Sequence, residues 1–211
     1  MSSAIVIEII CEGPTDFQVL RAVLIHHCQV PPDVTFLYKR FGTLPGKRLW
    51  DKVETARFQA GVSKYAVCVF VLDTEGKPSL MNDLIRGRNA RAGLPMPLGE
   101  AHPCIEAWLL VDATAIKRGL NLMQRPTTPV QPETIATANE AKMHLASYST
   151  QKVKELSVAE KAEIAIHIHW PTVAQTCQAF AAFDAELTTH IRALFSVPSN
   201  PAETLDASTT P

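Results

Sequence analysis

Short apolar runs and segments of helical spacing alternate along the first half of the chain. Residues 5–10 and 65–72 are apolar and rich in β-branched side chains, which predicts two buried strands. The second run has no polar alternation and is the better candidate for a central parallel strand. Residues 34–38 and 95–98 predict two further short extended segments.

Apolar positions recur at helical spacing after these strands and throughout the C-terminal part of the chain. The spacing predicts helices over residues 15–24, 49–60, 79–92, 103–112, 139–148, 158–167 and 170–195. We therefore expect an α/β fold, with a mostly parallel sheet of about four strands flanked by helices and a helical C-terminal part.

The pattern divides the chain into four parts. Residues 1–115 form the expected catalytic core. Residues 116–138, rich in Pro, Thr and Gln, are a predicted linker. Residues 139–195 are the helical part, and residues 196–211 are expected to be a disordered tail.

Composition narrows the class of protein. The chain has 211 residues, 46% of them hydrophobic, which is enough for one substantial domain. The formal net charge of −1 gives no global sign of nucleic-acid affinity, although a local basic patch stays possible. The five cysteines form no Cys-x-x-Cys pair, which favours reduced thiols in the cytoplasm. No apolar run approaches the roughly 20 residues of a membrane span, and Met1-Ser2-Ser3 lacks the charge of a signal peptide.

Acidic residues follow the two buried strands. Glu12 lies in the turn after residues 5–10, and Asp16 lies at or near the start of the next helix, for which Thr15 is the expected N-cap. Asp73 and Glu75 follow residues 65–72. An isolated acidic turn more often only caps a helix. Two such turns predict a site, because ligands bind outside the carboxyl ends of the strands in open α/β sheets.

Crowded carboxylates repel one another, and they stay ionised together only if a cation neutralises them. Oxygen ligands suit hard ions such as Mg²⁺ or Mn²⁺. Such an ion supports phosphodiester chemistry. The acidic turns therefore favour metal-assisted cleavage of phosphodiesters.

Glu106 lies in the apolar segment 101–112. It is expected either on a narrow polar stripe or buried with a partner. On a continuous helix it would share a face with His102, four positions earlier.

The order of strand, Glu-Gly-x-x-Asp turn, helix, and hydrophobic strand ending in an acidic-x-acidic pair resembles the Toprim fold over residues 4–112. The segment from His102 to Asp112 resembles diverged Toprim-like proteins of bacterial defence islands and retron-type loci, related to the overcoming-lysogenization-defect nucleases.

This resemblance implies a role for each acidic residue. Glu12 would be the general acid/base, and Asp73 and Glu75 would carry Mg²⁺ or Mn²⁺. Asp16 would be a supporting ligand or would orient the helix start, and Glu106 would be a further carboxylate at the site. The sequence departs from the family at Glu75, where the usual pair has a second Asp.

Two basic clusters are candidates for contact with a phosphate backbone. They could equally be solvated surface. They comprise Lys39, Arg40, Lys47 and Arg48 in a predicted glycine-containing loop, and Arg86, Arg88 and Arg91 at the end of a predicted helix. Arg48 follows Lys47, so the segment does not fit the Gly-Lys-Ser/Thr phosphate loop.

Other chemistry-bearing residues favour structural roles. Their patterns are more typical of surface or packed positions than of functional sites. These residues are the cluster His26-His27-Cys28, the pair His167 and His169, Cys104, and the tryptophans Trp50, Trp108 and Trp170.

The combined prediction is a Mg²⁺-dependent Toprim-type nuclease acting on DNA or RNA. The resemblance suggests an effector subunit of an antiphage system with an ATPase partner. Two alternatives stay open. One is a non-catalytic Toprim-shaped binding or regulatory subunit, and the other is phosphotransfer or small-nucleotide hydrolysis at the same acidic edge.

Overall fold

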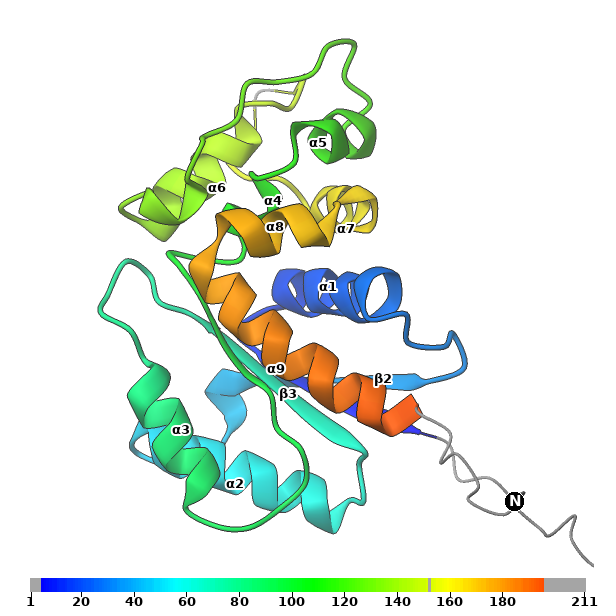
Figure 1. Cartoon of the computed structure of the whole chain (residues 1–211). Coiled ribbons are helices and arrows are strands. Elements are labelled where there is room, and N and C mark those ends of the chain that lie inside the picture. The colour runs from blue at the N-terminus through cyan, green and yellow to red at the C-terminus, as the bar shows by residue number, and fades with distance from the viewer. Residues whose placement is uncertain (1–4, 152, 196–211) are drawn as a thin grey trace, which may run out of the picture.

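The computed structural model describes residues 5–151 and 153–195 of the chain (Figure 1). The predicted tail, 196–211, lies outside the described residues. Four parallel strands form one sheet in the order β2-β1-β3-β4. Their bounds are β1 Val6–Cys11, β2 Thr35–Arg40, β3 Val67–Asp73 and β4 Leu98–Ala101. The predicted α/β class is confirmed, and the sheet is parallel throughout.

Both faces of the central strands are covered, which explains the absence of polar alternation in β3. Val67, Val69 and Val71 face one hydrophobic cluster. Cys68, Phe70 and Leu72 face the other. The first cluster also contains side chains of α1, Pro14–Ala22, its continuation η1, Val23–His27, and α9, Gln178–Phe195. The second contains side chains of α2, Leu49–Val62, and α3, Met81–Asn89.

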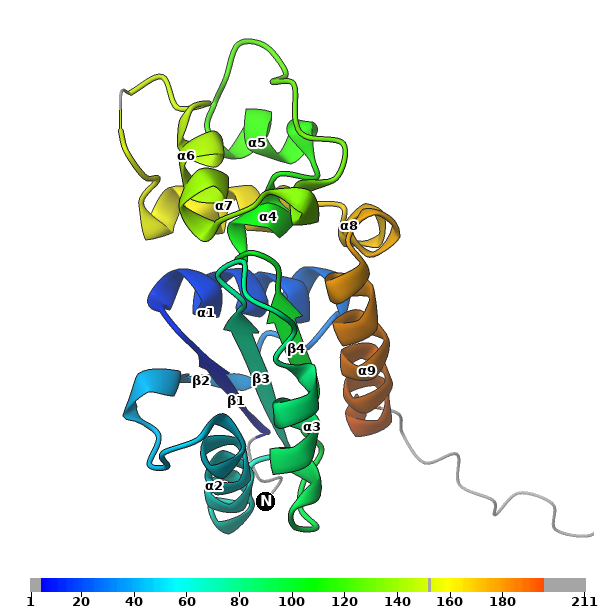
Figure 2. The same cartoon turned by 90° about the vertical axis from the view of Figure 1, so that its left-hand side faces the viewer.

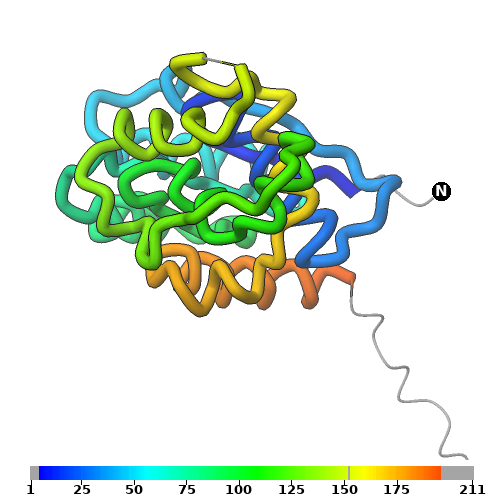
Figure 3. The backbone as a smooth tube through the Cα atoms, turned by 90° about the horizontal axis from the view of Figure 1, so that it is seen from above, coloured from blue at the N-terminus to red at the C-terminus, as the bar shows by residue number. Residues whose placement is uncertain are grey.

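A layer of short helices lies beyond the carboxyl ends of the strands (Figure 2). Viewed from above, this green and yellow part of the chain lies over the blue and cyan N-terminal part (Figure 3). We call it the helical layer. Its elements are α4 Glu106–Leu109, α5 Ala113–Gly119, η3 Pro132–Thr134, α6 Ala138–Ala146, α7 Val158–His167 and α8 Trp170–Thr176.

Aromatic rings join the helical layer to α9. Trp108 of α4 and Trp170 of α8 both lie against Phe180, with ring centroids 4.9 and 5.4 Å apart. Both indoles are buried. One hydrophobic cluster therefore contains residues from the predicted core and from the predicted helical part, and the division at residues 115 and 139 stays a prediction.

Several predicted helix boundaries are wrong. The predicted helix 170–195 is two helices, because Cys177 has extended backbone angles, φ −110° and ψ 110°. The predicted helix 103–112 is only the four residues of α4, and α5 begins at Ala113 under the cap of the Asp112 carboxylate. The N-cap of α1 is Gly13 instead of Thr15.

Two predicted strands also have different bounds in the structure. The fourth strand begins at Leu98, where the predicted segment 95–98 ends. β2 continues to Arg40, so Lys39 and Arg40 belong to a strand and not to a loop.

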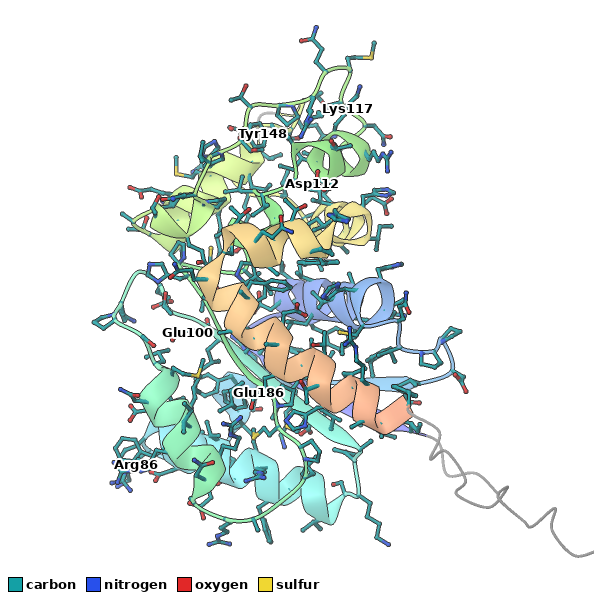
Figure 4. The ribbon with its side chains drawn as sticks, in the orientation of Figure 1. Arg86, Glu100, Asp112, Lys117, Tyr148 and Glu186 are labelled. Atoms are coloured by element: carbon teal, nitrogen blue, oxygen red, sulfur yellow. The ribbon has the colours of Figure 1, made fainter. Side chains whose placement is uncertain are left out.

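The absence of a side chain at Gly99 lets α9 pack against β4. A Cβ atom built there would lie 2.8 Å from Cδ2 of Phe183 and 3.1 Å from Cγ2 of Val71. Glu186 of α9 accepts a hydrogen bond from the Leu98 backbone N–H (3.0 Å) and pairs with Arg88 (Figure 4). This contact fixes the C-terminal helix to the edge of the sheet.

We expect Gly99→Ala to destabilise the protein by about 1–3 kcal/mol, because the new methyl group forces the Phe183 ring out of its packed position. Urea denaturation measures the change. Gly61→Ala in α2 is the matched control, because its Cβ would meet Leu94 at an ordinary 3.6 Å, and alanine favours a helix. Equal stability of the two variants would contradict the expected close packing.

Candidate acidic site at the carboxyl edge of the sheet

The strand ends bring Glu12 and Asp73 to one edge of the sheet. Glu12 directly follows β1, and Asp73 is the last residue of β3. These strands are hydrogen-bonded neighbours that run in the same direction, so their carboxyl ends meet below the helical layer (Figure 2). The predicted meeting of the two acidic turns is therefore observed for this pair.

Backbone groups fix two of the carboxylates. Asp16 lies in the first turn of α1, and its Oδ2 accepts a hydrogen bond from the Gly13 N–H at 2.8 Å. Oδ1 of Asp73 accepts a hydrogen bond from the Ile105 N–H at 3.1 Å. The turn before α1 and the turn before α4 thus set the orientation of these side chains.

Glu106 is buried with a partner, one of its two predicted environments. Its Oε1 lies 2.7 Å from Nζ of Lys161 in α7, and both side chains are 2% exposed. The same ammonium group lies 2.6 Å from Oε1 of Glu155. Oε2 of Glu106 is buried and has no hydrogen-bond partner among the described residues. The sequence pattern gave no sign of Lys161, which lies 55 positions away.

Burial, together with the neighbouring carboxylates, raises the pKa values of three acids at the site. Burial, followed by the charges of Asp16, Glu106 and Glu12, raises the pKa of Asp73 well above its usual 3.8. Burial raises the pKa of Asp16 to about 6, against the opposing effect of the Gly13 N–H. Burial and the nearby Glu75 raise the pKa of Glu12. The site therefore favours uptake of protons or of a cation.

Lys142 of α6 supplies a second positive charge at the site. Its ammonium lowers the pKa values of Glu12, Asp16 and Asp73. Burial lowers its own pKa, but Glu106 and other acidic groups outweigh this effect, so the net shift is upward. Sequence reasoning missed Lys142, because only the fold places α6 beside the strand ends.

Glu75 does not join the buried carboxylates. It adopts a left-handed backbone conformation, φ 52°, and its exposed side chain lies 2.7 Å from Nζ of Lys77. Thr74, the residue before it, is buried, and its hydroxyl Oγ1 is hydrogen-bonded to Nδ1 of His102 at 2.7 Å. His102 precedes α4, so it does not lie on one continuous helix with Glu106.

Four of the predicted basic contacts have acidic partners. Nζ of Lys39 donates to Gln59 and lies 3.8 Å from Glu8. Arg88 is mostly buried and forms an ion pair with Glu186, so its role is structural. The other two ion pairs are Arg48–Asp51 and Arg91–Glu54.

The remaining three basic side chains, Arg40, Lys47 and Arg86, are exposed. Arg40 ends β2 and therefore lies at the same edge as Glu12. Arg86 lies over the Trp50 ring at 4.1 Å, with Arg48 at 4.4 Å from the same ring. Figure 4 places Arg86 at the far end of the molecule from Asp112 and the helical layer.

The other predicted candidates have structural partners. His27 lies 2.8 Å from Asp184, and His169 interacts with Thr172. All five cysteines are free. Cys104 is buried, and a single ligand atom from each of Cys104, Asp73 and Glu106 lies within 4.8 Å of the other two.

A cavity of about 650 Å³ lies beside the acidic edge. The side chain of His102, hydrogen-bonded to Thr74, forms part of its wall. The polar part of the lining includes Ser79, Glu100, Gln131, Glu133 and Gln178. This cavity is separate from the cluster of buried carboxylates and contains two carboxylates of its own.

Comparison of the chain with protein-family models, with curated proteins and with solved structures finds no match. Among the helices of the described residues, none combines the length and the apolar character required to cross a membrane. The function is therefore inferred from the site itself.

We expect the stability of the metal-free protein to fall as the pH rises from about 4 to about 8. Because folding raises the pKa of Asp16 from 3.8 to about 6, the folded state holds this proton more tightly. Its contribution, up to about 3 kcal/mol, is complete below the unfolded pKa and is lost as the pH passes 6. Urea denaturation at several pH values measures it.

Asp16→Asn should flatten this pH dependence, whereas Asp33→Asn, on the exposed turn before β2, should leave it unchanged. A wild-type protein whose stability rises between about pH 5 and about pH 7 would contradict the assigned shift. An Asp16→Asn variant with the wild-type pH dependence would contradict it as well.

We expect Lys161→Met to destabilise the protein by about 3–5 kcal/mol, because it leaves the Glu106 carboxylate buried without its partner. Urea denaturation near neutral pH measures the loss. The double variant Glu106→Gln/Lys161→Met removes both charges and should recover much of the stability. If the single variant were as stable as the wild type, the ion pair would contribute nothing.

Proposed function

We propose that this chain is a Mg²⁺-dependent nuclease of the Toprim type, which cleaves phosphodiester bonds in DNA or RNA. The observation that carries the proposal is the convergence of Glu12 and Asp73, from the ends of two adjacent parallel strands, with Asp16 and Glu106. Besides burial, the charges of Asp16, Glu106 and Glu12 raise the pKa of Asp73, which supports a single site.

The residues fit a hard divalent ion. Asp73, Asp16 and Glu106 supply carboxylate oxygens. Oε2 of Glu106 is buried without a hydrogen-bond partner among the described residues and is available as a metal ligand. Glu75, the predicted ligand beside Asp73, is ion-paired with Lys77 and would have to leave that partner to take part. Bound Mg²⁺ would polarise the phosphoryl group and neutralise the charge that develops there.

Glu12 is the candidate for proton transfer. Its carboxylate is half-buried at the end of β1, and burial and Glu75 raise its pKa. A general base works best when its pKa lies near the working pH. Glu12 would take a proton from the attacking water, and the Lys142 ammonium would stabilise negative charge on the phosphoryl oxygens.

The exposed basic side chains define the proposed contact with the nucleic-acid backbone. Arg40, at the carboxyl edge, is paired in the sheet with Cys11, the residue before Glu12, and would bind phosphate next to the site. Lys47 and Arg86 would extend this contact along α2 and α3. The ion pairs of Lys39, Arg48, Arg88 and Arg91 make these residues less available.

The proposal includes a cellular setting. The free thiols suit the reducing cytoplasm. The sequence has no phosphate-loop motif, so an ATPase would be a separate partner protein. The resemblance to Toprim-like proteins of defence islands supports a role as an effector subunit against phage.

A second candidate function is a non-catalytic, Toprim-shaped binding or regulatory subunit. The specific observation in its favour is that Lys161 and Lys142 already offset part of the negative charge at the site. A site neutralised by its own lysines needs no metal ion and would catalyse no reaction.

Cleavage of plasmid DNA and total RNA with Mg²⁺ or Mn²⁺ tests the proposal. We expect Glu12→Gln and Asp73→Asn each to lower the cleavage rate by at least about 100-fold, because they remove the proton acceptor and a metal ligand. Glu163→Gln is the control, since this exposed carboxylate pairs with His167 in α7.

Calorimetric titration with Mn²⁺ separates the two candidates when the chain alone does not cleave. Metal binding that is lost in Asp73→Asn supports an enzyme that needs its partner protein. A folded wild-type chain that binds no divalent ion and cleaves neither polymer would support the binding subunit and reject the nuclease.

A further inference from the structure

The buried end of the acidic site contains a thiol. A single ligand atom from each of Asp73, Cys104 and Glu106 lies within 4.8 Å of the other two. Cys104 is completely buried and Glu106 is 2% exposed, whereas Asp73 is partly accessible. The three residues come from the end of β3, the turn before α4 and the start of α4.

A second observation points to a ligand at this place. Oε2 of Glu106 is buried without a hydrogen-bond partner among the described residues, while Oε1 is held by Lys161 at 2.7 Å. An unsatisfied carboxylate oxygen in a dry position costs free energy unless something binds it. The Cys104 thiol donates a long hydrogen bond, of 3.7 Å, to the carbonyl of Ala138.

The donor set differs from that of a Mg²⁺ site. Mg²⁺ prefers oxygen ligands, whereas Zn²⁺ and similar borderline-soft ions bind cysteine sulfur together with carboxylate oxygen. Three protein ligands with an open fourth position are typical of an accessible Zn²⁺ site. We propose that Asp73, Cys104 and Glu106 form a mixed sulfur–oxygen site for a thiophilic divalent ion such as Zn²⁺.

Binding requires a simple proton exchange. The Cys104 thiol loses its proton to solvent as the sulfur donates an electron pair to the ion, and no oxidation takes place. Asp73 and Glu106 are shared with the proposed Mg²⁺ site, so the two ions would compete. Zn²⁺ would therefore displace the hard ion that the proposed function requires, and Cys104 would determine which ion is preferred.

Titration of the full-length, metal-free protein with Co²⁺ tests the site without any activity measurement. Thiolate ligation gives a sulfur-to-cobalt charge-transfer band in the near ultraviolet. We expect this band to saturate at one equivalent, and Zn²⁺ to abolish it by displacement. Cys104→Ala should remove the band and weaken Co²⁺ binding by more than the roughly 10–100-fold caused by loss of an outer-shell partner.

Cys177→Ala is the matched control, since Cys177 is equally buried but lies between α8 and α9. This variant should keep the band. Circular dichroism establishes that each variant is folded. Absence of the band in wild-type protein, or its persistence in folded Cys104→Ala, would overturn the proposal.

A measurement on wild-type protein covers the case in which Cys104→Ala does not fold. The ¹¹³Cd resonance of the Cd²⁺-loaded protein lies far downfield for a thiolate ligand and upfield for oxygen ligands alone. A downfield resonance supports the site, and an upfield one rejects it. Either result is independent of the nuclease proposal, because loss of cleavage activity changes neither the band nor the resonance.

Discussion

Burial of several carboxylates at the ends of adjacent strands is the constraint on which this structure depends. Parallel pairing of β1 and β3 forces Glu12 and Asp73 together, and α1 and α4 add Asp16 and Glu106. Such a cluster requires positive charge nearby. Lys142 and Lys161 provide it from α6 and α7, so the helical layer stabilises the sheet electrostatically as well as through its aromatic contacts.

Local patterns are sufficient to predict the elements that form this edge. The β-branched runs at β1 and β3 identify buried strands, and parallel geometry then places Glu12 and Asp73 together without further information. Helix ends follow less directly from local patterns. Two examples are the break at Cys177 and the early end of α4. Trp108, Trp170 and Phe180 come from the segments on either side of these helix ends and pack against one another, and helical spacing alone does not contain such contacts.

The rest of the site depends on contacts between distant parts of the chain. Lys161 pairs with Glu106 across 55 positions, and no spacing rule links them. The acidic-x-acidic pattern predicts two adjacent ligands, but Glu75 has a left-handed backbone, is exposed and pairs with Lys77. The apolar pattern around Cys104 predicts a core residue, and Cys104 is buried. Its closeness to two carboxylates becomes visible only in three dimensions.

The position of α9 against β4 has a consequence for biosynthesis. The helix that covers one face of the sheet comes from residues 178–195, whereas the strands it covers end at Ala101. During translation, apolar side chains such as Val71 would leave the ribosome long before Phe183 could shield them. The nascent chain therefore has a prolonged period of aggregation risk, and contacts this far apart in sequence favour slow folding.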